Sequence, residues 1–397
     1  MRVAAPRRLH LGAGPELSMR GISTHLIHRL FRLVLTYART SARAFVKIVS
    51  VVGARPQFVK LAPIASALDG RAEHVIIHTG QHYDDLMSDV FFRDLGIPAP
   101  SVNLDVGSGS HGRQTGRLLE GLEREFEALE PDWVLVYGDT NSTVAAALAA
   151  VKMHFPVAHL EAGLRSFNRR MPEEHNRVLT DHAADLLLAP TAVAMTHLTR
   201  EGLADRAVMV GDVMTDVLYG VRDGLERSPR PLPFRVPTSG YYVATIHRPD
   251  NTDKPSRLRD IVRALSQLDK PVFLFAHPRL RKFAKQHSIP LDGGAIRAES
   301  PLAYPDLVQA VMHSSGVITD SGGLQKEAFL LRVPVTTIRP ETEWVETVQL
   351  GWNVLADDVT HIAAAVSRPT PAATSATPYG DGHAAEAVVD ALLTAKK

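Results

Sequence analysis

Two carboxylates stand where an open α/β sheet would bind its ligand. Residues 133–137 and 157–160 are short apolar runs, and Asp139 and Glu161 follow them closely. In such sheets ligands gather at the carboxyl ends of the strands. Two interpretations of Asp139 stay open, a cap on the helix that begins at Thr140 or a catalytic group. A carboxylate is costly to bury unpaired, so Glu161 is either bridged to Arg165 or kept for proton transfer.

Two glycine-containing turns have the composition of phosphate sites. After the apolar run at 47–52 come Gly53, Arg55 and Lys60, which gives two cations near the start of a helix. They are either phosphate contacts or solvated charges. Asp320-Ser-Gly-Gly follows a later apolar run and begins another predicted helix. Backbone N–H groups and a hydroxyl at such a helix start can bind a phosphate.

Further charged groups follow other strands or share a helix face. His247 comes directly after a run at the start of the second half of the chain, and His277 follows the next run; each has an arginine close behind it. This repeated placement favours contact with an anion, although single histidines are more often core residues. Glu173 and Arg177 lie four residues apart on one predicted helix, where a surface ion pair is the alternative. No pair of histidines sits at zinc-ligand spacing with a third nearby, so no metal site is predicted.

The elements that must position these residues alternate along the chain. Short apolar runs separated by helical stretches recur from residue 47 onward, the pattern of a doubly wound parallel sheet. Prolines cluster at 228–239, and a second alternating series begins at 241. We therefore predict an α/β protein with two Rossmann-like domains facing a cleft, the first of them covering 46–228 and the second beginning at 229.

Composition excludes several classes of function. The 397 residues exceed the size of one hydrophobic core, which also favours two domains. A net charge of +1 gives no reason to expect nucleic acid as a partner. The chain has no cysteine, so disulfides, thiolate metal sites and cysteine nucleophiles are excluded, and a cytoplasmic location is predicted. No apolar run is long enough to span a membrane.

The N-terminal residues 1–45 differ from the rest of the chain. Up to residue 44 they carry eight arginines and one acid, Glu16. The apolar stretch at 30–35 is interrupted by Arg32, which argues against a secretory signal. We predict a disordered extension that the fold does not need.

Seven motifs together resemble one family in their order and spacing, from about residue 46 to the C-terminus. The family is that of the non-hydrolysing UDP-N-acetylglucosamine 2-epimerases. The motifs are Gly53-Ala-Arg-Pro-Gln, Gly80-Gln-His-Tyr-Asp, Gly138-Asp-Thr-Asn-Ser-Thr, His159-Leu-Glu-Ala-Gly-Leu-Arg, Pro172-Glu-Glu-His-Asn-Arg, Asp320-Ser-Gly-Gly-Leu-Gln-Lys-Glu and Pro378-Tyr-Gly-Asp-Gly. The resemblance implies a GT-B-like fold whose C-terminal helix, within 380–397, returns to the first domain and leaves 229–379 to a UDP-binding domain. It also implies a homodimer.

The chemistry that the resemblance implies is reversible inversion at C2 of a UDP-N-acetylamino sugar, UDP-GlcNAc to UDP-ManNAc. UDP is eliminated to leave a 2-acetamidoglycal and then added back, without cofactor or metal. The catalytic residues implied are Asp139, Glu161, Glu173, Arg177 and His247. The residues implied for UDP binding are Arg55, Lys60, His247, Ser321, Gly322, Gly323 and Glu327.

Departures from the family pattern leave the substrate open. The common motifs carry threonine, glutamate and arginine where this chain has Ala54, Gln57 and Trp344. These changes resemble the branch that acts on UDP-2,3-diacetamido-2,3-dideoxy-glucuronate, which is therefore the alternative substrate. A GT-B glycosyltransferase, a hydrolysing epimerase and an inactive UDP-sugar sensor are further alternatives, and the set of carboxylates argues against the first and the last.

Overall fold

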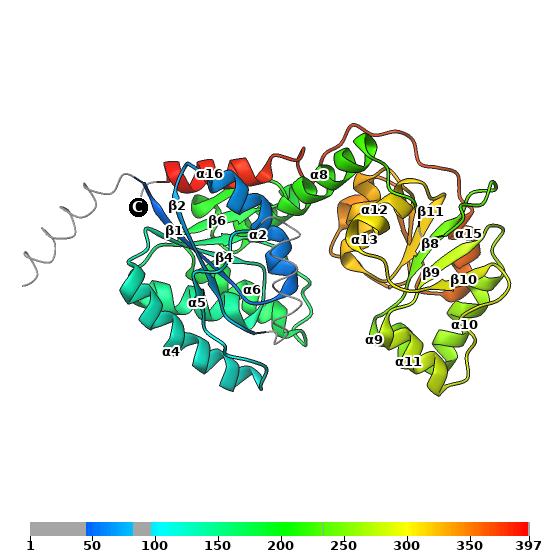
Figure 1. The fold of residues 1–397 in the computed structure, drawn as a ribbon, viewed down its shortest axis with the longest axis horizontal. Coiled ribbons are helices and arrows are strands. Elements are labelled where there is room, and N and C mark those ends of the chain that lie inside the picture. The colour runs from blue at the N-terminus through cyan, green and yellow to red at the C-terminus, as the bar shows by residue number, and fades with distance from the viewer. Residues whose placement is uncertain (1–44, 82–96, 233, 396–397) are drawn as a thin grey trace, which may run out of the picture. The chain divides into compact units, whose positions relative to one another are not determined.

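The computed structural model describes residues 45–81, 97–232 and 234–395, without the side chain of Arg55. Residues 47–397 form one compact unit, which contains two parallel sheets with helices around them (Figure 1). The predicted extension lies almost wholly outside the described residues, as do residues 82–84 of the second motif.

The first sheet has the strand order β3-β2-β1-β4-β5-β6-β7, and all its pairings are parallel. Its strands are β1 (Lys47–Val52), β2 (Glu73–His78), β3 (Val102–Asn103), β4 (Trp133–Tyr137), β5 (Val157–Leu160), β6 (Leu186–Ala189) and β7 (Ala207–Met209). Its helices are α2 (Arg55–Leu68), α4 (His111–Leu129), α5 (Asn141–Lys152), α6 (Pro172–Ala183), α7 (Ala192–Arg200) and α8 (Val213–Arg227).

The second sheet has the order β10-β9-β8-β11-β12-β13 and is also parallel throughout. Its strands are β8 (Tyr242–Thr245), β9 (Val272–Phe275), β10 (Ile296–Glu299), β11 (Gly316–Thr319), β12 (Val335–Thr337) and β13 (Asn353–Leu355). Its helices are α9 (Pro249–Thr252), α10 (Pro255–Ser266), α11 (Pro278–Gln286), α12 (Tyr304–Met312), α13 (Gly322–Leu330), α14 (Val345–Gln349) and α15 (Ile362–Val366). The last helix of the chain, α16 (Ala384–Thr394), packs instead on helices of the first sheet. The predicted α/β class is confirmed.

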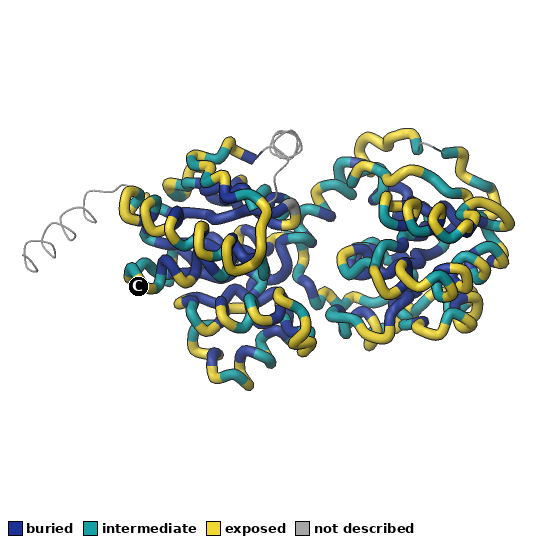
Figure 2. Tube along the Cα trace, turned by 90° about the horizontal axis from the view of Figure 1, so that it is seen from below, coloured by how far each residue is buried: buried dark blue, intermediate teal, exposed yellow. Residues whose placement is uncertain are grey.

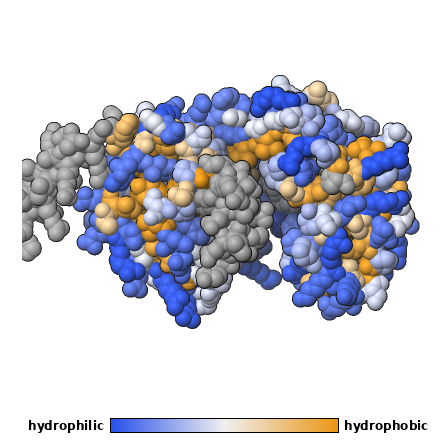
Figure 3. All heavy atoms as spheres, in the orientation of Figure 1, coloured by the Kyte–Doolittle hydropathy of each residue, from blue (hydrophilic) through white to orange (hydrophobic). Residues whose placement is uncertain are grey.

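The apolar runs became strands because both faces of each sheet are covered. Every residue of β4, β5 and β6 is buried, as continuous hydrophobic runs require in parallel sheets. Figure 2 shows buried segments inside both sheet layers and exposed segments on the outer faces of the helices. Among the described residues no helix is both long and apolar enough to cross a membrane, and Figure 3 shows hydrophilic and hydrophobic residues interspersed on the described surface.

Strand order reverses at two points, and the candidate residues follow the strands at both. In the first sheet the chain runs outward from β1 to β2 on one side and from β4 to β5 on the other. In the second sheet β8 and β11 are the corresponding neighbours. Ligands of open α/β sheets bind at such switch points, outside the carboxyl ends of the strands. Asp139 follows β4, and His247 and Ser321 follow β8 and β11.

The C-terminal helix packs on the first sheet's helices, in line with the predicted return. α16 lies beside α2 (Figure 1), and Arg71 forms a 2.6 Å ion pair with Asp390. The backbone N–H groups of Ala384 and Ala385 donate to Asp216 at the start of α8. A half-buried carboxylate at the N-terminus of α16 therefore fixes this helix to α8.

Deleting residues 1–44 should leave the compact unit intact. The β1 ladder starts at Lys47, and its pairings with β2 and β4 use only residues from 47 onward. We expect the melting temperature to change by less than about 2 °C, the scale of neutral changes. Differential scanning fluorimetry of both chains, with the turnover assay described below, measures this. A loss of folded protein would contradict the prediction.

Candidate functional site

Two pockets lie at the carboxyl ends of the strands. The carboxylate pocket, of about 260 Å³, is lined by Lys60, Asp139, Glu161, Arg177, Glu343 and Trp344, among others. The apolar pocket, of about 520 Å³, is lined by His247, Phe275, Leu302, Ser321, Tyr304 and Glu327, among others. Pro56 and Gly323 line both pockets, so the two are adjacent.

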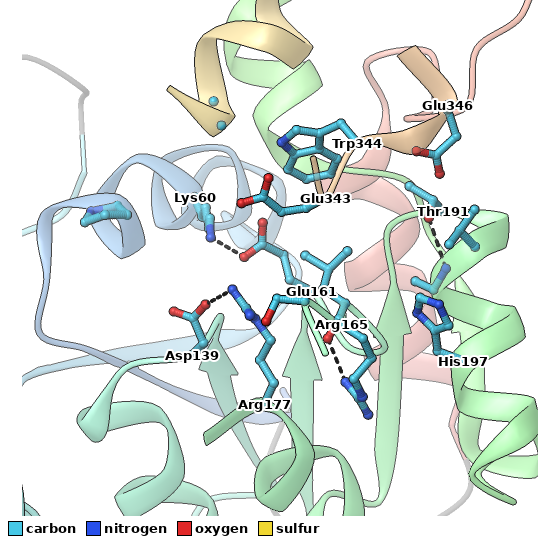
Figure 4. A pocket seen from close by; sticks show the side chains of 17 residues that line it. Lys60, Asp139, Glu161, Arg165, Arg177, Thr191, His197, Glu343, Trp344 and Glu346 are labelled. Carbon is cyan, nitrogen blue, oxygen red and sulfur yellow. Dashed lines mark hydrogen bonds and ion pairs between the residues drawn. The ribbon is translucent and has the colours of Figure 1, made fainter. Parts of the chain in front are cut away.

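Asp139 is paired with an arginine. Its carboxylate lies 2.5 Å from Arg177, which also contacts Glu174 at 3.2 Å. Asp139 does not cap the helix that follows it, which was one of its two possible roles. Thr140 is the cap instead, and its hydroxyl accepts from the N–H of Thr143. Asp139 is therefore available to the pocket, and Figure 4 shows it facing Arg177 there.

Glu161 pairs with Lys60 rather than with Arg165. The two side chains form a hydrogen-bonded ion pair inside the carboxylate pocket (Figure 4). Burial alone would lower the pKa of Lys60, but Glu161 beside it, helped by Asp139 and Asp212, holds that pKa above its ordinary value. Lys60 is thus a fixed cation at neutral pH. The backbone of Glu161 is left-handed, with φ of +71°, a conformation costly for a residue with a side chain and frequent at functional sites.

Two neighbouring glutamates on α6 have different surroundings. Glu173, the predicted catalytic residue, is exposed and lines neither of the two pockets. Glu174 is buried and accepts from the N–H and hydroxyl of Ser166 and the N–H of Phe167. Burial would raise the pKa of Glu174, but these donors and Arg177 hold it below its usual value. Glu174 therefore stabilises the loop before α6.

A buried aspartate holds His247 at the apolar pocket. The N–H groups of His247 and Arg248 donate to the Asp320 carboxylate, and Nδ1 of His247 lies 3.1 Å from it. Burial would raise the pKa of Asp320, but the contacts with His247, Asn251 and Arg248 keep it low. An ionised Asp320 thus orients His247, with the other ring nitrogen free to meet a ligand.

The start of α13 has the geometry of an anion site. Ser321 is the N-cap and accepts from the N–H of Leu324, while Gly322 and Gly323 form the first turn. A side-chain carbon at Gly323 would meet nothing within 4 Å, so the backbone there is open to a ligand. Free N–H groups and the helix dipole favour phosphate at such a terminus.

Glu327 also lines the apolar pocket. Its carboxyl accepts from the Tyr304 hydroxyl at 3.1 Å. Burial raises the pKa of Glu327, and Lys326 and Tyr304 offset this only in part. The apolar lining by Phe275, Leu302 and Leu307 suits a flat ring. A carboxylate that lines such a pocket can accept hydrogen bonds from the hydroxyl groups of a bound sugar.

The two pockets gather most of the predicted residues. Asp139, Glu161, Arg177 and Lys60 meet in the carboxylate pocket, together with Gly322 and Gly323. His247, Ser321, Gly323 and Glu327 meet in the apolar pocket. Glu173 is in neither, and the side chain of Arg55 lies outside the described residues. Arg279 pairs with Asp253 and lines neither pocket, although His277 lines the apolar one.

Sequence reasoning missed several residues of the carboxylate pocket. Glu343 pairs with Arg339 at 2.9 Å and with Arg248 at 3.6 Å, and Glu346 accepts from the Tyr379 hydroxyl. Thr191 and His197 form part of the wall. Glu343 and Glu346 stand on either side of Trp344 in the sequence, but neither directly follows a strand, so their position did not mark them as ligand groups. Within the described ranges, no group of histidine and acidic residues is arranged to hold a metal ion.

Comparison with known families decides what these pockets belong to. The family model described as UDP-N-acetylglucosamine 2-epimerase matches residues 66–393. The chain belongs to this family. As a member of this epimerase family it is an isomerase, so the glycosyltransferase alternative is set aside.

Individual relatives of this epimerase cover nearly the whole described chain. A UDP-N-acetylglucosamine 2-epimerase homolog of Methanococcus maripaludis is 42% identical over 353 residues, covering 87% of this chain and 99% of the relative. The UDP-2,3-diacetamido-2,3-dideoxy-D-glucuronate 2-epimerase of Pseudomonas aeruginosa is 43% identical over 357 residues, with the same two shares covered.

A solved relative supports the fold of the epimerase as well. The Methanocaldococcus jannaschii UDP-GlcNAc 2-epimerase, crystallised in complex with UDP-GlcNAc and UDP, has a TM-score of 0.74 and 36% identity. It covers 88% of this chain and 100% of the solved one. The predicted fold class, two Rossmann-like α/β domains of GT-B type, is confirmed.

Proposed function

We propose that the enzyme interconverts UDP-N-acetylglucosamine and UDP-N-acetylmannosamine by inversion at C2. The observation that carries the proposal is the carboxylate pocket, where Asp139 and Glu161 lie opposite the first turn of α13. Carboxylates are the proton-transfer groups that inversion requires, and the helix terminus is the anion site that a departing diphosphate requires.

The reaction needs no change of oxidation state. As a carboxylate takes the C2 proton, the C2–H electron pair forms the C1–C2 double bond. The C1–O electron pair then leaves with the β-phosphate of UDP, giving a 2-acetamidoglycal. In re-addition the phosphate oxygen attacks C1, and a protonated group returns a proton to C2 on the opposite face. The family resemblance assigns these transfers to Asp139, Glu161 and Glu173.

UDP fits the apolar pocket by its chemistry. We assign the flat base and ribose to the pocket around Phe275, with Glu327 accepting ribose hydroxyls, and the diphosphate to Ser321 and the glycines of α13. His247, held by Asp320, then contacts the leaving diphosphate. Arg177 holds Asp139, and Lys60 holds Glu161, so that neither carboxylate is an uncompensated charge before substrate binds.

The test is turnover of UDP-N-acetylglucosamine in D₂O, followed at C2 by proton NMR. We expect UDP-N-acetylmannosamine to form with deuterium at C2 and EDTA to have no effect. Free N-acetylmannosamine with UDP as the only products would mean a hydrolysing epimerase. Absence of exchange would reject the proposal.

The alternative substrate rests on the Pseudomonas aeruginosa relative, named for UDP-2,3-diacetamido-2,3-dideoxy-D-glucuronate. The same NMR assay with that nucleotide sugar decides between the two substrates by their kcat/KM values.

We further propose that the enzyme acts in the cytoplasm as a homodimer. The absence of cysteine fits a reducing compartment, and sedimentation velocity of the full chain tests the dimer.

A further inference from the structure

Four buried or half-buried titratable side chains adjoin the carboxylate pocket, and one of them, Arg165, lines it. His159 in β5 and Asp181 in α6 have completely buried side chains, and Nδ1 of His159 lies 2.6 Å from Asp181. Arg165 reaches the same aspartate at 2.7 Å and Glu201 at 2.7 Å. We call these residues the charge network. Arg165 contacts both acids, while His159 contacts Asp181 alone.

Hydrogen bonding defines the protonation state of His159. Its Nε2 lies 2.8 Å from the carbonyl oxygen of Gly138, which can only accept, so Nε2 carries a proton. Its Nδ1 faces a carboxylate that also accepts from the N–H of Gly163. Burial would raise the pKa of Asp181, but His159, Arg165 and this N–H hold it below its usual value. Asp181 also forms an ion pair with the guanidinium of Arg165 at 2.7 Å, as an ionised carboxylate does, so Nδ1 must donate as well, which makes His159 an imidazolium.

The contacts of His159 and Asp181 connect segments that carry Asp139, Glu161 and Arg177 of the carboxylate pocket. The Gly138 carbonyl that His159 binds immediately precedes Asp139. His159 and Gly163 lie two residues before and after Glu161. Asp181 belongs to α6, whose first two turns carry Glu173 and Arg177. One buried ion pair thus connects the loop after β4, the loop after β5 and α6.

The loop after β5 depends on this support. Glu161 has φ of +71° and Gly163 has φ of +80°. A side-chain carbon at Gly163 would come within 2.5 Å of the Ala194 carbonyl oxygen, so only glycine fits there. A left-handed residue persists only where its surroundings over-determine it. The Gly163 N–H bond to Asp181 and the strand pairing of His159 supply that constraint on either side of Glu161.

We propose that His159, as a buried imidazolium paired with Asp181, is a positioning residue that holds Asp139 and Glu161 at the geometry needed for proton transfer at C2. The role in catalysis rests on the proposed function. The charged groups facing the pair are Arg165 and, behind it, Glu201. None of the network residues that act on His159 touches the apolar pocket, so UDP binding should not depend on them.

The charge of His159 can be measured without any activity. In full-length protein labelled with ¹⁵N-histidine, both ring nitrogens of His159 should carry a proton at pH 7, because each of them faces an acceptor. The signal is assigned by its absence in His159→Gln. His74 is the internal control, because burial lowers its pKa to about 4 and it should be neutral at pH 7. A neutral His159 at pH 7 would overturn the proposal, whether or not the enzyme proves to be an epimerase.

The positioning role is tested with Asp181→Asn, which keeps the shape of the side chain and removes its charge. Misplacement of reacting groups by about 1 Å can cost about 100-fold in rate, so we expect kcat to fall about 10- to 100-fold while the Kd of UDP, measured by calorimetry, is unchanged. The matched control is His74→Gln, which removes another largely buried histidine of the same sheet. A wild-type kcat, or a parallel loss of kcat and UDP affinity, would refute a positioning role. If the variant does not fold, the NMR measurement on wild type still decides the charge.

Discussion

Replacing Glu161 by glutamine should lower kcat by about 100-fold or more, the scale of a lost general acid–base group. Glutamine has the same shape and can occupy the same left-handed backbone, so the loop is not disturbed by size. It cannot take a proton from C2, and it leaves Lys60 without the carboxylate that it binds. Because Glu161 does not line the apolar pocket, UDP should bind within about threefold of its wild-type affinity.

Glu73→Gln is the matched control for this variant. Glu73 forms another lysine–glutamate pair of the same sheet, at 2.9 Å from Lys47, at the opposite ends of the strands. It is half exposed, and such surface pairs contribute little. Single-turnover deuterium exchange at C2 and UDP calorimetry are compared for the two variants. If Glu161→Gln keeps kcat within about threefold of the control, Glu161 serves only to neutralise Lys60.

The sequence predicts the fold and the strand-end positions well, for a physical reason. Fully buried parallel strands are continuous apolar runs, and the runs at 133–137 and 157–160 match β4 and β5 without a shift. Ligand groups of such sheets follow the strands directly, so Asp139 and Glu161 could be singled out by position alone. The short edge strands β3 and β7, of two and three residues, were missed because so few residues show no alternation.

Partners across the sheet could not be predicted. The sequence suggested Arg165, four residues away, as one alternative for Glu161, with proton transfer as the other, but the partner of Glu161 is Lys60, which lies 101 residues earlier in the chain. Arg165 instead forms an ion pair with Asp181, so Glu161 does not pair with it. The sequence shows Glu173 and Glu174 only as two neighbouring acids in the first turn of a helix. Which of them faces inward depends on where α6 begins relative to the loop that Glu174 binds, and the sequence does not show this. The local sequence pattern therefore indicates which positions carry functional side chains, while the ion pairs that these side chains form depend on tertiary contacts.

A second large effect is expected from Lys326→Met, on stability rather than on chemistry. Lys326 and Asp212 form a buried ion pair, with 4% and 0% of their side chains exposed. The ammonium also lies 4.3 Å from the centre of the Trp344 ring. Removing one member of a buried pair leaves an uncompensated charge and typically costs about 3–5 kcal/mol. Here the remaining carboxylate would also repel two half-buried acids, Glu327 and Asp216, because the charge of Asp212 already contributes to raising their pKa values.

We expect the apparent melting temperature of Lys326→Met to fall by at least about 5 °C. Lys270→Met is the matched control, because Lys270 also lies over an aromatic ring, 5.5 Å from the centre of Tyr242, but its hydrogen bond goes to Ser315 rather than to a carboxylate. That control should change the melting temperature little. The double variant Lys326→Met/Asp212→Asn keeps the helix cap that Asp212 gives to the N–H of Met214 and removes the unpaired charge. It should therefore recover much of the loss, since a buried pair replaced as a unit is often nearly neutral. If the double variant is no more stable than the single one, lost packing against Trp344, and not the uncompensated charge of Asp212, accounts for the effect.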